Sequence, residues 1–175
     1  MSLAYLMNAN NAIGSTYMAQ AEAMGHRMGI FGAPSLTFVE PRDQIAAAVT
    51  AWGLYGFETI LAFHLRRSPS LITPPSWPQP EYDRAAMTFG EIYIAYPGYK
   101  DTVPMNIGST VVALMELFML MNRITYDSFH KSANENEFTS EQALAYRAKL
   151  ITWFNRLPKS LSPVNIVLPC ALKLQ

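Results

Sequence analysis

The sequence has little of what metal sites and disulfides require. Its 175 residues include one cysteine, Cys170, and three scattered histidines. A single cysteine excludes an internal disulfide and any cysteine-based zinc cluster, and it is typical of a reducing compartment. Because no two histidines lie three or four residues apart, we expect no metal site in this chain.

Charge is scarce as well. Only 15% of the residues are charged, the formal net charge is zero, and the first lysine is Lys100. Binding to nucleic acid needs clustered Lys and Arg, so we expect no direct nucleic-acid contact. The sequence also lacks a glycine-rich phosphate loop and a G-x-S-x-G elbow. We therefore expect no catalytic residue, no cofactor and no enzymatic activity.

One long apolar stretch organises the chain. From Ile45 to Leu65 the only formal charge is Glu58, and these 21 residues are followed by five prolines between positions 69 and 80. As a helix the run would be about 30 Å long, and its apolar faces require surrounding protein. We predict a buried central helix at about 43–65 and then a strap, residues 66–80, which proline keeps irregular.

A membrane is the rival environment for this stretch, because a run of such length can cross a bilayer. The polar groups of Glu58, Thr59 and His64 would then need partners in hydrocarbon. We expect no membrane, and a membrane-associated helical protein remains an alternative.

Further helices are predicted on both sides of the central one. Gly14-Ser15 is a candidate N-cap before an apolar stripe that Gly29 ends. Ser109 is a candidate N-cap for a largely buried helix, and Thr139 with Gln142 forms a capping box before another. The stripe of the first helix is Tyr17, Ala21, Met24 and Met28.

The connections and ends are irregular in pattern. The segment 81–107 is rich in aromatic residues and is predicted to be irregular, with no partner for a strand in EIYIAY. Residues 3–7 resemble the end of one helix and Pro169 the start of another, so apolar patches are expected at 3–7 and 166–174. We predict one partial domain, 1–175: an all-α, irregular array of about five helices with two long Pro/aromatic-rich connections, incomplete at both ends.

The glutamates in apolar helices are the main candidates for a functional role. Glu58 must find a partner, either an arginine of the next helix or loop amides, unless it is a polar contact in a ligand pocket. Glu116 invites the same two interpretations. If a pocket for a small apolar molecule exists, Trp52, Glu58 and Met115 are its candidate lining.

An enzymatic alternative would place Glu58 and His64 in a cleft. Their six-residue separation turns through about 600° on a helix, which leaves them roughly 120° from sharing a face. A small helical enzyme would therefore need groups from another element.

Four stretches together resemble the regulatory (middle homology) domain of fungal zinc-cluster transcription factors, in the subgroup similar to nitrate-assimilation activators. They are AEAMGHRMGIF at 21–31, TAWGLYGFETILAFHLRRSPSLITPPSWPQPE at 50–81, FGEIYIAYPG at 89–98 and the C-terminal stretch from Ile151. In the first, Ala23 and Gly25 replace the usual arginine and alanine. In the second, Ser68 separates the arginine from the proline of an R-P pair. The second stretch matches at Trp52, Leu54, Arg67, Pro69, Pro78 and Pro80.

The resemblance implies a fragment of a transcription regulator that acts in the nucleus. It implies protein partners or a homodimer, and a small apolar effector is one further implication. The family's zinc-binding, DNA-binding cysteine cluster is absent from these residues, so zinc is expected only in that missing element.

Overall fold

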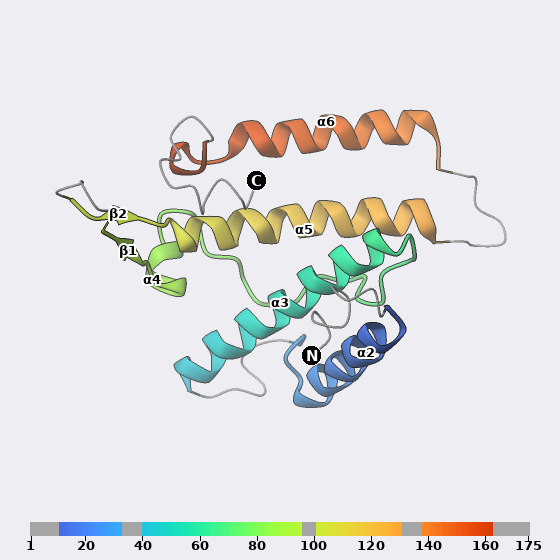
Figure 1. Ribbon diagram of the computed structural model, residues 1–175, viewed down its shortest axis with the longest axis horizontal. Coiled ribbons are helices and arrows are strands. Elements are labelled where there is room, and N and C mark those ends of the chain that lie inside the picture. Colours follow the sequence, from blue (N-terminus) through green and yellow to red (C-terminus); the bar gives the residue numbers. More distant parts are fainter. Residues whose placement is uncertain (1–10, 33–39, 96–100, 131–137, 163–175) are drawn as a thin grey trace. The chain divides into compact units, whose positions relative to one another are not determined.

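The computed structural model describes residues 11–32, 40–95, 101–130 and 138–162, and Figure 1 colours the helices along the sequence. The fold is all-α, as predicted. Within the described residues there are five α-helices, one short 3-10 helix and one two-stranded sheet. The predicted helical ends at 3–7 and after Pro169, with their expected apolar patches, lie outside the described residues.

Two compact units divide the chain. The first comprises Met1–Pro78 and Met121–Ser132, and the second comprises Gln79–Leu120 and Ala133–Gln175. Helix α5, Ile107–Phe129, contributes residues to both units.

In the first unit, helix α2 (Asn11–Met28) packs on helix α3 (Pro41–His64). Helix α2 begins three residues before the predicted Gly14-Ser15 cap, which therefore lies inside the helix. Its buried positions are Gly14, Met18 and Gly25, whereas the predicted stripe is largely exposed at Tyr17, Met24 and Met28. Gly25 lies against the side chains of Ile30 and Phe31 in the turn after α2, and a search for large apolar residues overlooks a face that contains glycines.

The central helix is present, with bounds close to the predicted 43–65. A proline at its first turn fits the start of α3, where its missing N–H removes no helical hydrogen bond. The buried face includes Ala51, Trp52, Tyr55 and Leu61, while Ile45, Val49, Ile60 and Phe63 are exposed. The helix is thus buried on one side and not on all sides.

Helices α3 and α5 are each long and apolar enough to cross a membrane, judged by length and composition alone. Half of the most apolar window of α3 is buried within the protein, but only 28% of that of α5 is. The expectation of a largely buried α5 is therefore wrong, because most of its residues are only partly buried.

The second unit contains helix α4 (Ala85–Phe89) and strands β1 (Tyr93–Ile94) and β2 (Val103–Pro104). The strands are antiparallel, with Tyr93 opposite Pro104 and Ile94 opposite Val103. This corrects the prediction that the EIYIAY segment has no strand partner. A partner only two residues long, one of them proline, carries no alternation from which it could be recognised.

Helix α6 (Ser140–Arg156) begins at the predicted capping box, and a short 3-10 helix, η2 (Lys159–Leu161), follows it. The Gln142 amide donates to the Thr139 hydroxyl at 3.2 Å, and the Thr139 amide donates to the Gln142 side chain at 2.8 Å. The cap predicted at Ser109 is wrong, because α5 already begins at Ile107. Gly108, in the first turn of α5, lies against the backbone of Ala85 at the start of α4.

We predict that Gly108→Ala destabilises the protein by about 1–3 kcal/mol, because an added methyl would overlap main-chain atoms that cannot rotate away. A Cβ at this position would lie 2.5 Å from the Ala85 carbonyl oxygen and 2.6 Å from the Ala86 nitrogen. Urea unfolding followed by circular dichroism measures the change.

The matched control is Gly53→Ala in the middle of α3, where a Cβ meets nothing within 4 Å. There alanine should stabilise the helix by about 0.5–1 kcal/mol, because glycine loses more backbone entropy on folding. Shifts of the same sign in both variants would contradict this packing.

Candidate functional site

A sharp turn at the end of α3 brings the strap back along the helix that precedes it. The Arg67 amide donates to the Ala62 carbonyl at 3.0 Å and the Arg66 amide to the Phe63 carbonyl at 3.2 Å, the two bonds of a Schellman motif. Arg66 has a φ of 52°, in the left-handed region that normally favours glycine. The turn therefore holds a non-glycine residue in a costly conformation and directs Arg67 toward α3.

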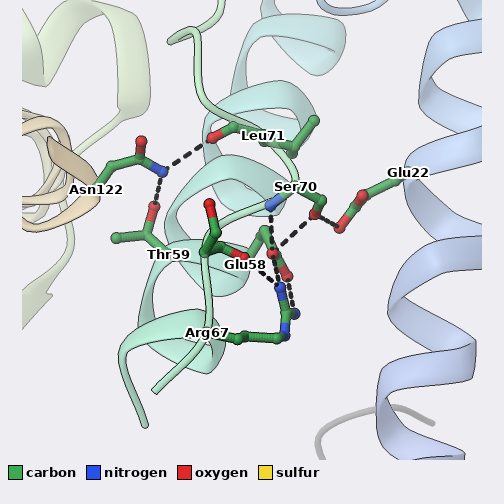
Figure 2. A network of polar contacts seen from close by, with 8 residues as sticks. Glu22, Glu58, Thr59, Arg67, Ser70, Leu71 and Asn122 are labelled. Atoms are coloured by element: carbon green, nitrogen blue, oxygen red, sulfur yellow. Dashed lines mark hydrogen bonds and ion pairs between the residues drawn. The ribbon is translucent and has the colours of Figure 1, made fainter. Parts of the chain in front are cut away.

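The buried carboxylate of Glu58 forms an ion pair with Arg67. Glu58 is 0% exposed, and its two oxygens accept from Nη1 and Nη2 of Arg67 at 2.7 and 2.9 Å (Figure 2). Such fork-to-fork pairing is the strong, directional form of an arginine–carboxylate contact. The predicted arginine partner exists, but it comes from the strap, nine residues away, and not from the next helix.

Ser70 completes the shell around Glu58. Its amide donates to Oε1 of Glu58 at 2.9 Å and its hydroxyl contacts the same oxygen at 2.7 Å. Burial by itself raises the pKa of Glu58, but the hydrogen bonds from Arg67 and Ser70 outweigh burial, so the pKa of this carboxyl is lowered. Glu58 is therefore ionised at neutral pH.

Asn122 of α5 joins the same network from another element of the first unit. Asn122 is 2% exposed, and its side-chain amide donates to the Thr59 hydroxyl and the Leu71 carbonyl, each at 2.9 Å (Figure 2). Both protons of the NH₂ group are thus used. One buried asparagine ties α5 to α3 and to the strap at once.

The far end of the strap is fixed to the turn that follows α2. The buried Trp77 donates its indole N–H to the Ile30 carbonyl, and the Ser76 amide donates to the Phe31 carbonyl at 3.4 Å. Gly29 ends α2 with a φ of 70°, as predicted for a glycine just beyond a helix. The strap is held at both ends.

The three predicted lining residues belong to two helices and to both units. Trp52 and Glu58 lie on α3, six residues apart, and Met115 lies in the part of α5 that belongs to the second unit. All three are buried. The lining of a ligand pocket by these residues stays a prediction.

Trp52 packs against an aromatic neighbour, and its indole nitrogen is buried. Its ring packs edge-on against Tyr55 with centroids 5.8 Å apart, and burial raises the pKa of Tyr55 to about 12. Among the residues that the structure describes, no hydrogen-bond acceptor faces the buried indole nitrogen of Trp52.

Glu116 has a simpler environment in the second unit. Its carboxylate accepts a hydrogen bond from the Tyr82 hydroxyl at 3.0 Å. Burial, this hydrogen bond and the charge of Glu116 all raise the pKa of Tyr82. The partner of Glu116 is thus a tyrosine hydroxyl. It is neither the arginine nor the loop amides that were expected for a glutamate in an apolar helix.

The chemistry open to the Glu58 cluster is limited. A carboxylate that accepts two bonds from a guanidinium and two from a serine is a poor base, since its proton affinity is lowered. His64, the other residue of the enzymatic alternative, is exposed at the end of α3. Within the described ranges, no group of three or more His, Cys, Asp or Glu side chains is placed to hold a metal ion.

Comparisons with protein-family models, curated proteins and solved structures find no match to this chain. What bears on its function is therefore the arrangement of its own residues and the patterns in its sequence.

We predict that Glu58→Gln lowers the free energy of unfolding by about 2–3 kcal/mol at pH 7. Removing one partner of a buried ion pair typically costs about 3–5 kcal/mol, and the cost is smaller here because the Arg67 side chain is 36% exposed. Since folding lowers the pKa of Glu58 from 4.5, its stabilisation is present above pH 4.5 and is lost as the pH falls through the folded-state pKa. Urea unfolding from pH 3 to pH 8 should show the gap between wild type and variant closing in acid.

Glu116→Gln is the matched control, because it removes the charge of a glutamate held by one tyrosine hydroxyl. We expect a loss of about 1 kcal/mol. Equal losses for the two glutamates, or a Glu58→Gln gap that does not change with pH, would contradict the role of the ion pair.

Proposed function

We propose that this chain is part of a transcription regulator: a fragment of the regulatory domain of a fungal zinc-cluster transcription factor, working in the nucleus by protein interaction and without an enzymatic activity of its own. The observation that supports this proposal is where the residues that match the family's motifs lie in the structure. Trp52 and Pro69 are buried, and Arg67 neutralises Glu58. One motif position, Arg67, thus holds the strap to α3, and two others are buried, which suits an interaction module better than an active site.

A surface for protein partners is the second support. Helix α6 carries apolar side chains on two faces roughly opposite one another, given 100° per residue. Tyr146 is buried on one face and stacks with Phe138 at 6.3 Å. The other face is exposed at Leu144, Ala148, Ile151 and Phe154. A helix that is apolar on an exposed face favours association with another protein.

The full chain fused between a heterologous DNA-binding domain and an activation segment tests the regulatory role. We expect reporter output to differ at least severalfold from that of a fusion without the chain, because a regulatory domain acts on activation in cis. Glu58→Gln should weaken the difference by loosening the first unit, whereas the exposed Glu81→Gln should leave it unchanged. Identical output with and without the chain, at equal protein level, would sink the proposal.

The partner surface predicts self-association of the isolated chain. At micromolar concentration we expect oligomers or aggregates by sedimentation velocity, and Ile151→Lys should reduce them because a charge on the exposed face opposes apolar contact. Thr152→Lys places the same charge on the neighbouring exposed residue and is the control. A monodisperse, cooperatively melting wild-type monomer would contradict this prediction.

Membrane association is the second candidate function, favoured by the two helices that could span a bilayer. Flotation of the chain with lipid vesicles, resistant to carbonate extraction, would favour it over protein partners. Against it stands the charge of the Arg67 side chain just after α3, which is 36% exposed and would be costly in contact with hydrocarbon.

A further inference from the structure

One hydroxyl in the network contacts two carboxylates. Oγ of Ser70 lies 2.7 Å from Oε1 of Glu58 and 2.9 Å from Oε1 of Glu22, which α2 carries (Figure 2). A serine hydroxyl has one proton to donate. If it serves one carboxylate, the other contact is a hydrogen bond only when that carboxyl supplies a proton of its own.

The surroundings decide which carboxyl carries the extra proton. Glu58 receives the guanidinium of Arg67 and the amide of Ser70, and these donors require the ionised form. The side chain of Glu22 contacts the Ser70 hydroxyl at 2.9 Å and is only partly exposed. The neutral form therefore belongs to Glu22.

The partial burial of Glu22 agrees with that assignment. Burial, the largest cause, raises the pKa of Glu22, and the charge of Glu58 raises it further; a hydrogen bond donated by Ser70 to the ionised carboxylate acts in the lowering direction. Arg67 on the strap and His26 on α2 act in the lowering direction, and the net pKa of Glu22 is raised above 4.5. Among the residues that the structure describes, these are the charged groups that act on the pKa of Glu22 from α2, α3 and the strap.

We propose that Glu22 fastens α2 to the strap only while its carboxyl is neutral, through a chain of hydrogen bonds in which Glu22 donates to Ser70 and Ser70 donates to Glu58. When Glu22 ionises, the contact with Ser70 loses its proton and two carboxylates face one hydroxyl. The packing of α2 on the first unit is thus linked to pH. This link is independent of the function proposed above.

The two glutamates give opposite pH dependences. A group whose folded-state pKa is raised contributes stability that is present below its unfolded value, 4.5 for Glu22, and is lost as the pH rises through the folded pKa. Glu58 contributes in the reverse sense, with stability lost in acid. Acid therefore tightens the α2 contact until Glu58 itself becomes protonated.

Hydrogen exchange of the full chain, measured by mass spectrometry between pH 4 and pH 8 and corrected for intrinsic rates, tests this. Protection of α2 amides, relative to α3 amides, should fall as the pH rises. Glu22→Gln supplies an uncharged donor to Ser70 at every pH, so α2 in this variant should exchange about two- to tenfold more slowly than wild type at pH 7. The protection of α2 in this variant, relative to α3, should not depend on pH above pH 4.5, where Glu58 keeps its full contribution.

Ser70→Ala removes the bridging hydroxyl and separates the hydrogen-bond chain from a plain charge effect. In that background Glu22→Gln should give little further protection, and Glu81→Gln, which removes an exposed carboxylate elsewhere, should change nothing in α2. The proposal would be overturned if Glu22→Gln slowed exchange of α2 as much in the Ser70→Ala background as in wild type. It would also be overturned if the protection of α2 in wild type did not change with pH. A side-chain NMR titration in which the Glu22 carboxyl titrates at or below 4.5 would overturn it as well.

Discussion

The strap must satisfy its polar backbone without regular structure, and the first unit is built around this requirement. Proline removes amide donors and prevents helix, so the remaining amides and carbonyls need partners elsewhere. They find them in side chains and turns of three helices: Glu58 for the Ser70 amide, Asn122 for the Leu71 carbonyl, and the turn after α2 for the Ser76 amide. An irregular segment thereby becomes the common contact of α2, α3 and α5.

The Glu58–Arg67 pair does more to fix the path of the chain after α3 than to add to the net free energy of folding. Desolvating two charges offsets much of their attraction, and only a full set of hydrogen bonds makes the burial tolerable. Glu58 has such a set, from Arg67 and Ser70. An apolar residue there would leave Arg67 and the Ser70 amide without this acceptor. The carboxylate selects one path for the chain after α3.

The sequence was most informative where a local rule decides the structure. The Thr139–Gln142 capping box, the glycine end of α2 and the central helix depend on neighbours in the chain, and the all-α class follows from them. The sequence also indicated that Glu58 must have a partner, since a lone buried charge is not tolerated. Which groups would meet it was not readable, because Arg67 reaches it only through the left-handed Arg66, an unfavoured conformation. Asn122 and Glu22 carried no signal at all, since distant segments had to fold before their partners were near.

The contacts of the first unit differ in the length of the loop that each one closes. The pair between Glu58 and Arg67 spans nine residues, whereas Asn122 reaches Thr59 across 63 and Glu22 reaches Ser70 across 48. Short loops close faster and lose less entropy than long ones. The end of α3 with its returning arginine can therefore form before the rest of the chain has folded. It then holds the Ser70 hydroxyl and the Leu71 carbonyl in place for the later contacts of Glu22 and Asn122.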